Sequence, residues 1–272
     1  MVYRVFHPVP VLCHIVEHYW YVSSQSGELP DQQYFYTPLL QALAFSFQKQ
    51  EEHYVLPDKT FTLNKTAYLF GQGTGPRTAT SNAVDYLGVK FRPLGIARIT
   101  GINMAHLTDQ IIDMEDIWGN ELESLLDEMQ SSPDIEGTIN VLEGFLIKKY
   151  LAVPVNHKIN SVQNALMLIN QTQGNLNVKT IQQQTNTSRK TLERAFIHNL
   201  GIHPKLYSRI VRFNAVKNKL DRINKDESLT SIGLDFGFYD SSHFTSEFKF
   251  FSGLTPLHYL KKIDNNFVLQ DF

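Results

Sequence analysis

An internal repeat in the carboxy-terminal part of the chain constrains its fold more than any other feature of the sequence. Large apolar residues, a glycine, a proline and a tyrosine recur there with an offset of 52 residues. The matched pairs are Leu192 and Phe244, Phe196 and Phe248, Gly201 and Gly253, Pro204 and Pro256, and Tyr207 and Tyr259. A repeat of this kind indicates two copies of one supersecondary unit.

Each copy shows the pattern of two helices joined by a tight turn. We expect a short amphipathic helix over 178–185 in the first copy and over 229–236 in the second. The helix that follows carries large apolar residues at i and i+4, with glycine beyond its end and proline opening the next helix. A short helix, a turn and a second amphipathic helix are typical of a helix-turn-helix motif, whose second helix enters the DNA major groove.

The second helix of each copy has an apolar face and a polar face. The apolar stripes are Leu192, Ala195 and Phe196 in the first copy and Phe244, Phe248 and Phe251 in the second. The polar faces are Lys190, Glu193 and Arg194 in the first copy and Ser242, Thr245, Ser246 and Lys249 in the second. Two such helices at a fixed offset predict two DNA-reading units.

Charge is distributed unevenly along a chain whose net charge is −2. Residues 1–159 hold 11 basic and 18 acidic side chains, whereas residues 160–272 hold 14 and nine. Ten of these basic residues fall within 175–222, where Glu193 and Asp221 are the acidic ones. A basic patch on an otherwise acidic chain favours a polyanionic partner, and a solvated helical face is the alternative.

A long helix is expected between the two copies, over 204–221, with Leu206, Ile210, Phe213 and Leu220 on its inner side. At 1.5 Å per residue this helix spans about 27 Å, and successive major grooves on one face of DNA lie about 34 Å apart. A rigid helix of that length can hold two units in adjacent grooves.

These segments resemble the DNA-binding domain of the AraC/XylS family of transcription regulators, over about residues 160–272. The similarity is carried by residues 188–196 (SRKTLERAF), 201–207 (GIHPKLY), 232–238 (IGLDFGF), 240–249 (DSSHFTSEFK) and 253–256 (GLTP). The resemblance implies two helix-turn-helix motifs joined by one helix. It also implies recognition helices that begin near Ser188 and Ser241.

The resemblance further implies that the exposed faces of the recognition helices read DNA bases. The residues placed on these faces are Arg189, Lys190, Glu193, Arg194, Ser241, Ser242, Thr245, Ser246 and Lys249. Arginine can bond guanine with two hydrogen bonds, whereas serine and threonine make less discriminating contacts. We therefore predict that the first unit is the principal reader and supplies most of the electrostatic affinity.

Three positions depart from the pattern of the family. Gln182 and Gly233 stand where the first helix of each unit usually has alanine. The larger, polar Gln182 disfavours close packing in the first unit. His203 stands where serine or threonine usually caps the connecting helix, whereas Thr255 keeps that cap in the second copy.

The first half of the chain has a β-rich pattern. Short runs of aromatic and β-branched residues predict strands over 33–37, 43–47, 60–63 and 86–91. From about Leu107 the pattern becomes helical, with apolar residues at helical spacing over 121–129 and 135–146. An antiparallel sandwich or barrel followed by helices is therefore expected.

This half resembles the uncharacterised β-rich, sensor-like domain found in a subset of the same family. The similarity lies in residues 56–58, 71–72, 88–93, 107–109 and 118–119, and it implies a cupin-like β-barrel followed by helices, with an unknown effector. The predicted fold is α+β in two domains. The first domain covers 1–152 and is expected to be a cupin-like β-barrel with trailing helices. The second domain covers 160–272 and is expected to be all-α. The boundary between them is expected within 152–156.

Other motifs in the first half have structural explanations. His14, Glu17 and His18 match a zinc-protease string that requires a helix, but their surroundings favour a strand, in which Glu17 points away from both histidines. No metal site is predicted there. Glycine-rich residues 71–75 lack the lysine of a phosphate loop and predict a turn. The single cysteine, Cys13, is expected to be buried or inert.

Three arginines, Arg77, Arg92 and Arg98, lie in the β-rich half. They can line a sensor pocket for an anionic ligand, or they can be ordinary surface residues, which is the commoner case.

The sequence favours a DNA-binding transcription regulator, not an enzyme and without a cofactor, controlled by a ligand or by dimerisation through its first domain. Double-stranded DNA is the predicted partner, and a small-molecule effector, a second copy of the chain and RNA polymerase are further candidates. We expect a cytoplasmic protein without a membrane partner, because no long apolar run or signal peptide is found. The alternatives are a metal-dependent cupin-type enzyme with an appended helical domain, and a protein-interaction module.

Overall fold

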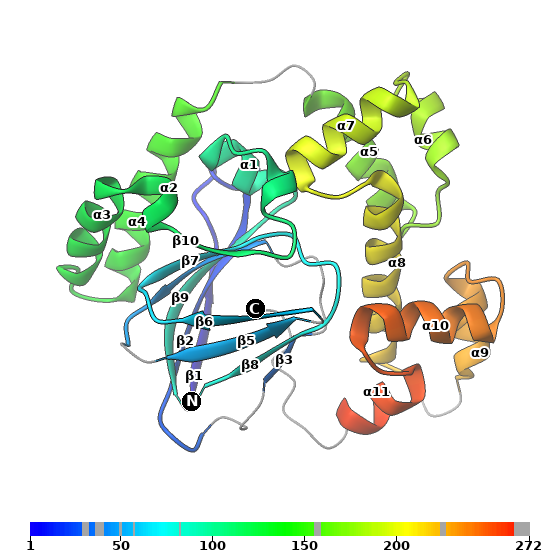
Figure 1. Cartoon of the computed structure of the whole chain (residues 1–272), viewed down its shortest axis with the longest axis horizontal. Helices are drawn as coiled ribbons and strands as arrows, with labels where there is room; N and C mark the ends of the chain where they lie inside the picture. The colour runs from blue at the N-terminus through cyan, green and yellow to red at the C-terminus, as the bar shows by residue number, and fades with distance from the viewer. Residues whose placement is uncertain are drawn as a thin grey trace.

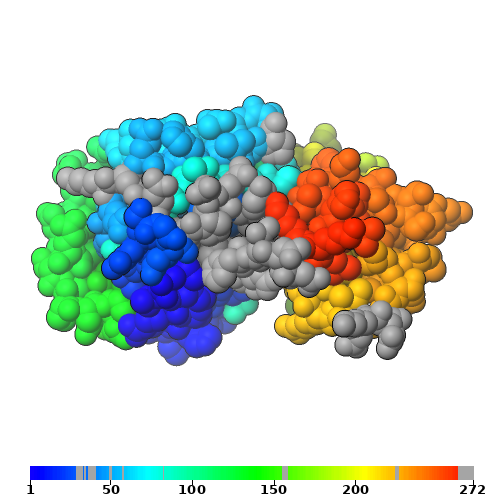
Figure 2. All heavy atoms as spheres, turned by 90° about the horizontal axis from the view of Figure 1, so that it is seen from below, coloured from blue at the N-terminus to red at the C-terminus, as the bar shows by residue number. Residues whose placement is uncertain are grey.

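The computed structural model describes residues 1–28, 33–35, 41–48, 51–56, 58–81, 83–154, 159–223 and 227–263. A β-rich amino-terminal part with trailing helices is followed by a helical carboxy-terminal part (Figure 1). The predicted α+β architecture is confirmed. Figure 2 shows the two parts side by side, with the segments coloured yellow to red forming one end of the molecule.

The strands form two antiparallel sheets. The first has the order β1 (Val2–Phe6), β2 (Val16–Ser24), β9 (Val84–Phe91), β4 (Ala42–Ser46), β7 (Ala67–Phe70) and β10 (Ile111–Asp113). The second has the order β3 (Gln33–Phe35), β8 (Arg77–Thr80), β5 (Glu52–Leu56) and β6 (Lys59–Leu63). Among the described strands no hydrogen-bonded pairing joins the two sheets, so the barrel expected from the sequence is not closed, and the β-rich part consists of two separate sheets.

Helices cover one face of the six-stranded sheet. They are α1 (Gly95–Thr100), the 3-10 helix η1 (Met104–His106), α2 (Glu115–Trp118), α3 (Asn120–Gln130) and α4 (Ile135–Ala152). Successive side chains of a strand point to opposite faces. Tyr19 of β2 therefore packs in the core beneath the helices, whereas Trp20 packs in a second core shared with the four-stranded sheet.

The four predicted strands and the helices over 121–129 and 135–146 are present, as β3, β4, β6, β9, α3 and α4. The expected change to helix at Leu107 is wrong. Helix α1 begins earlier, at Gly95, and the chain then returns to the sheet as β10 beside β7. Strand β10 has three residues, and its pairing with a distant strand, rather than its own sequence pattern, creates it.

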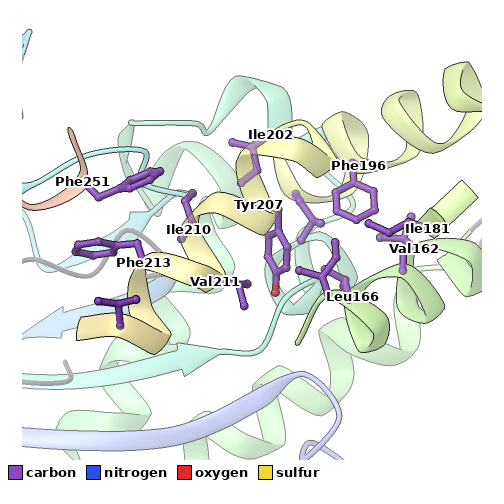
Figure 3. Close-up of a cluster of buried hydrophobic side chains, with 14 of the residues drawn as sticks. Val162, Leu166, Ile181, Phe196, Ile202, Tyr207, Ile210, Val211, Phe213 and Phe251 are labelled. Carbon is purple, nitrogen blue, oxygen red and sulfur yellow. The ribbon is translucent and has the colours of Figure 1, made fainter. Parts of the chain in front are cut away.

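The carboxy-terminal part contains seven helices within residues 159–263. They are α5 (Ile159–Gln171), α6 (Val178–Gln184), α7 (Arg189–Leu200), α8 (Pro204–Leu220), α9 (Leu229–Asp235), α10 (Ser241–Ser252) and α11 (Pro256–Ile263). Helices α7 and α10 start and end with an offset of 52 residues, as the repeat predicts. Helix α8 is the common element of one continuous core (Figure 3).

The ends of α7 and α10 are fixed in the same way. Ser188 Oγ accepts a hydrogen bond from the Thr191 amide at 3.2 Å, and Asp240 Oδ1 accepts one from His243 at 2.7 Å. At the other end Gly201 and Gly253 both have a left-handed backbone, with φ of 78° and 75°. Glycine adopts this conformation without steric cost, so both helices stop at the same point of the repeat.

Candidate nucleic-acid interface

The polar residues predicted on the first recognition helix lie on the surface of α7. Arg189, Lys190 and Arg194 are exposed, and Glu193 is half-buried. Arg189 Nε donates to Glu193 Oε1 at 2.9 Å, one turn along the helix. This pair leaves Lys190 and Arg194 as the cations of α7 without an ion-pair partner among the described residues.

The corresponding surface of α10 is polar and nearly uncharged. Ser241, Ser242, Ser246 and Lys249 are exposed, and Thr245 is half-buried. The two helices are equivalent in position but differ in chemistry, as the sequence predicts.

Tyr239 is a surface residue that the sequence patterns do not single out. It lies in the turn between α9 and α10, directly before the capping residue Asp240, and its side chain is 88% exposed. A large aromatic residue with that exposure at the start of α10 is accessible to a binding partner. Periodicity does not reveal this residue, because turn residues belong to no apolar stripe.

Helix α8 holds the two units together through buried and half-buried cations. Arg212 Nη2 donates to the carbonyl of Gly174 at 3.1 Å, and its Nη1 donates to Gly237 at 3.3 Å. Gly174 precedes the first unit and Gly237 ends α9 of the second, so one side chain bridges both. Arg209 binds both carboxylate oxygens of Glu247 on α10 at 2.8 Å.

The basic residues of 175–222 therefore have two roles. Arg209, Arg212, Lys217 and Lys219 lie on α8 and bind partners within the protein. The exposed members of the set are Lys179, Arg189, Lys190, Arg194, Lys205 and Arg222. Only part of the basic charge in this region is available to a polyanion.

The carboxy-terminal ends of both recognition helices face the β-rich part (Figure 1). Thr108 Oγ1, after η1, donates to the carbonyl of Gly201 at 2.8 Å. A side chain at Gly253 would lie 3.6 Å from Pro76, in the connection between β7 and β8. Arg194 lines a groove together with Asn103. The amino-terminal part thus touches both copies of the repeat at equivalent positions.

The packing around the family departures differs between the units. Gln182 is half-buried. At Gly233 a Cβ atom would lie 3.0–3.2 Å from the side chain of Phe244, so the small residue allows close contact of α9 with α10. His203 precedes α8 without a side-chain capping hydrogen bond. Thr255 Oγ1 accepts a bond from the His258 amide at 3.3 Å.

The zinc-protease string does not lie in one element. His14 is exposed in a turn and not in a strand, which corrects that expectation, whereas His18 lies in β2. Within the described ranges no three histidine, cysteine, aspartate or glutamate side chains form a cluster that can hold a metal ion. Cys13 is exposed and not buried.

The three arginines of the β-rich part have different surroundings. Arg92 is exposed and donates to the Cys13 carbonyl at 2.8 Å. Arg98 lies over the ring of Tyr150, 4.7 Å from its centre. Arg77 is 4% exposed and lines a cavity between the two sheets.

Comparison with known proteins gives matches to both parts of the chain. Residues 181–262 match a family described as "Helix-turn-helix domain", and residues 4–113 match "Domain of unknown function (DUF6597)". The HTH-type transcriptional regulator ArgR of Pseudomonas aeruginosa is 30% identical over 109 residues. This match covers 38% of the chain and 32% of the relative, so the chain spans about a third of that relative's length.

Solved structures with similar folds are also found. ToxT from Vibrio cholerae O395 is similar over 97% of this chain and 99% of its own, with 12% identity and a TM-score of 0.49. The AraC-like transcriptional activator CuxR is similar over 79% of this chain and 86% of its own, with 13% identity and a TM-score of 0.30. In the described part of the chain, every helix is too short or too polar to cross a membrane.

Proposed function

Residues 181–262 belong to the AraC-type helix-turn-helix domains, and from this premise we propose that the chain is a sequence-specific DNA-binding transcription regulator. The observation that carries the proposal is the duplicated unit. Two equally capped helices, α7 and α10, are held on one connecting helix and present exposed polar faces. Two readers fixed in this way suit two adjacent stretches of major groove.

In this proposal α7 is the principal reader. Lys190 and Arg194 provide its charge, with Arg189 and Glu193 beside them. The second helix contributes Ser241, Ser242, Thr245, Ser246 and Lys249. Because the two helices differ in chemistry, one chain binds an asymmetric site and needs no palindrome within it.

The domain division proposed is 1–152 and 160–272, with the first domain controlling the second. Two contacts between the domains support this control. Thr108 donates a hydrogen bond to the carbonyl of Gly201, and Pro76 lies beside Gly253. A change in the β-rich domain at either contact alters the position of a recognition helix.

Selection of bound fragments from genomic DNA with the full chain tests the function. The expected result is enrichment of fragments that share one asymmetric motif, and loss of this enrichment in the double variant Lys190→Ala, Arg194→Ala. The matched control, Lys205→Ala, removes an exposed cation outside the recognition helices and retains the motif. Fragments without a common motif, or an identical motif from the double variant, would contradict the proposal.

A further inference from the structure

The space between the two sheets is a partly open cavity of the β-rich domain that the proposed function leaves unexplained. Its volume is about 70 Å³, and its walls come from both sheets. The apolar lining includes Trp20, Val22, Ala44, Phe70 and Val84. Arg77 and Glu52 line the same space, together with the hydroxyl-bearing Tyr54 and Tyr86.

Arg77 is a buried cation at this wall, and Asp109 favours its charge only from beyond ion-pair distance. Its Nη2 atom donates to the Gly71 carbonyl at 3.0 Å, but Nε and Nη1 are buried with no hydrogen-bond partner in the described structure. No carboxylate among the described residues forms an ion pair with it. Leaving a buried cation unpaired is costly, and buried charges in folded proteins are usually paired.

Glu52 does not neutralise Arg77. Its Oε1 atom accepts a hydrogen bond from the Tyr86 hydroxyl at 2.6 Å. Tyr86 belongs to the other sheet, so this bond holds the Glu52 carboxyl group towards that sheet. Burial raises the pKa of Glu52 to about 7, so the group is partly protonated near neutral pH. Arg77 therefore faces the cavity without an ion-pair partner among the described residues, and an anion from outside the chain would complete it.

We propose that this cavity binds a small carboxylate with a short hydrocarbon body, held by the free Nε and Nη1 atoms of Arg77. The proposal deepens the proposed function, because such a ligand is an effector of the regulator. Guanidinium and carboxylate match in shape and charge. One water needs on the order of 10–15 Å³ of such space, so the cavity has room for about five to seven non-hydrogen atoms.

The surroundings of Arg77 connect the cavity to the recognition helices. Residues 71–76 run from the carbonyl that Arg77 binds to Pro76, which lies beside Gly253. Within this segment Thr74 donates to Asp109 through its amide at 2.8 Å and its hydroxyl at 2.6 Å. Thr108, the neighbour of Asp109, donates to Gly201. A ligand that draws the guanidinium from Gly71 thus acts on both helix ends.

Calorimetric titration of the full chain with butyrate, at constant ionic strength, tests the site. Butyrate has six non-hydrogen atoms and fits, whereas its neutral analogue butyramide has the same shape without the charge. We expect butyrate to bind about tenfold or more tightly than butyramide, as for one charge-assisted pair. Octanoate is too long for the cavity and should bind more weakly than butyrate. Equal binding of butyrate and butyramide, or tighter binding of octanoate, would overturn the proposal.

Two variants locate the binding. Arg77→Met removes the charge and should abolish the preference for butyrate, while thermal stability stays equal or rises, because an unpaired buried cation is lost. Ala44→Leu keeps Arg77 but fills the cavity from the opposite sheet, and it should also lose butyrate. Retained butyrate binding in either folded variant places the ligand elsewhere and refutes the site.

A DNA-binding measurement separates this inference from the proposed function. If the chain selects a DNA motif but shows no preference for butyrate, the cavity assignment is wrong and the regulator remains. If butyrate binds through Arg77 and no motif is selected, the ligand site stands and the proposed function fails. With both correct, butyrate changes DNA affinity in the wild type and leaves that of Arg77→Met unchanged.

Discussion

Phe248 lies where α10, α8 and α11 meet. Its ring centre is 5.1 Å from that of Phe213 and 5.3 Å from that of Tyr259, and the residue is 1% exposed. Ile232 of α9 belongs to the same core as Phe248, whereas Leu234 is 54% exposed. The short α9 turns only one side towards the core, and Ile232 occupies that side.

Truncation of Phe248 should therefore destabilise the helical domain strongly. Phe248→Ala is expected to lower the free energy of unfolding by about 3–5 kcal/mol, because it leaves a cavity among aromatic rings. Leu234→Ala is the control and should change it by less than about 0.5 kcal/mol. Denaturant unfolding followed by circular dichroism measures both, and similar values for the two variants would show that the core is misassigned.

Glu52 makes the stability of the β-rich domain depend on pH. Its folded pKa of about 7 lies above the value in an unfolded chain, so its contribution is complete at low pH and is lost as pH rises through 7. The tyrosines around it, Tyr54, Tyr68 and Tyr86, stay uncharged between pH 5 and 8, because burial raises the pKa of each. Burial lowers the pKa of Arg77 from an ordinary value far above this range.

Wild type should lose about 2–3 kcal/mol more unfolding free energy than Glu52→Gln between pH 5 and pH 8. The glutamine retains an acceptor for Tyr86 but does not titrate. Tryptophan fluorescence reports this domain, since Trp20 and Trp118 are the two tryptophans of the sequence. Parallel pH profiles for the two proteins would refute the assignment.

Substitutions of Arg194 and Ser246 allow a direct comparison of the DNA-binding contributions of α7 and α10. Arg194→Ala should cost about 1–3 kcal/mol of DNA-binding free energy and relax specificity at one base pair. Ser246→Ala should cost less, because a hydroxyl contact discriminates bases weakly. Titrations of both variants on one selected site at fixed salt measure this, and a larger loss at Ser246 would reverse the order of the readers.

At the scale of elements, the repeat places helices α8 and α11 at equivalent positions, but their amino-terminal ends are capped differently. Helices α8 and α11 both open with proline, but only Thr255, before α11, provides a side-chain cap. His203, before α8, provides none. An unsatisfied helix terminus weakens the first turn.

His203→Thr should therefore stabilise the chain by about 0.5–1 kcal/mol, and Thr255→Ala should destabilise it by a similar amount. For a domain of this size, 1 kcal/mol corresponds to a shift of about 4 °C in the melting temperature. Calorimetric melting of the two variants tests the pair. A lower melting temperature for His203→Thr would mean that the histidine makes a contact that compensates for the missing cap.

At the scale of the whole molecule, the two copies of the repeat meet the β-rich domain with unequal closeness. A Cβ atom at Gly201 would lie 2.3 Å from Thr108 Oγ1 and 2.6 Å from the Met104 carbonyl. At Gly253 the nearest atom, of Pro76, is 3.6 Å away. Leu94, between β9 and α1, also packs into the core of the helical domain. The first unit is thus the more tightly docked.

Two alanine variants, Gly201→Ala and Gly253→Ala, distinguish the role of glycine in ending a helix from its role in the contact between the two domains. Alanine is strained in the left-handed conformation, which should cost both variants about 1–2 kcal/mol. Gly201→Ala should lose more, because its methyl group would also overlap the Met104 carbonyl. Only Gly201→Ala should speed amide hydrogen exchange at His106 and Leu107, because its methyl group pushes α7 away from η1. Equal exchange in both variants would mean that the docking contact does not order these amides.

The carboxy-terminal domain could be predicted from its sequence because its information is local. Helical periodicity, capping residues and glycine stops act within a few residues, and the repeat states them twice. The ends of α7 and α10 before Gly201 and Gly253 and the exposure of Lys190, Arg194 and Ser246 follow from that pattern, and the helix starts near Ser188 and Ser241 follow from the family resemblance. Whether these residues contact DNA stays a prediction.

The features of this protein that depend on contacts between residues distant in sequence were decided by its tertiary structure. Strand β10 exists because β7 offers an edge, and Arg77 is distinguished from Arg92 and Arg98 only by the second sheet that encloses it. The internal use of Arg209 and Arg212 likewise requires α8 to lie between both units. Periodicity specifies which face of an element is apolar, whereas the partner of that face is set by packing of the whole chain, so the docking and the cavity became visible only in the fold.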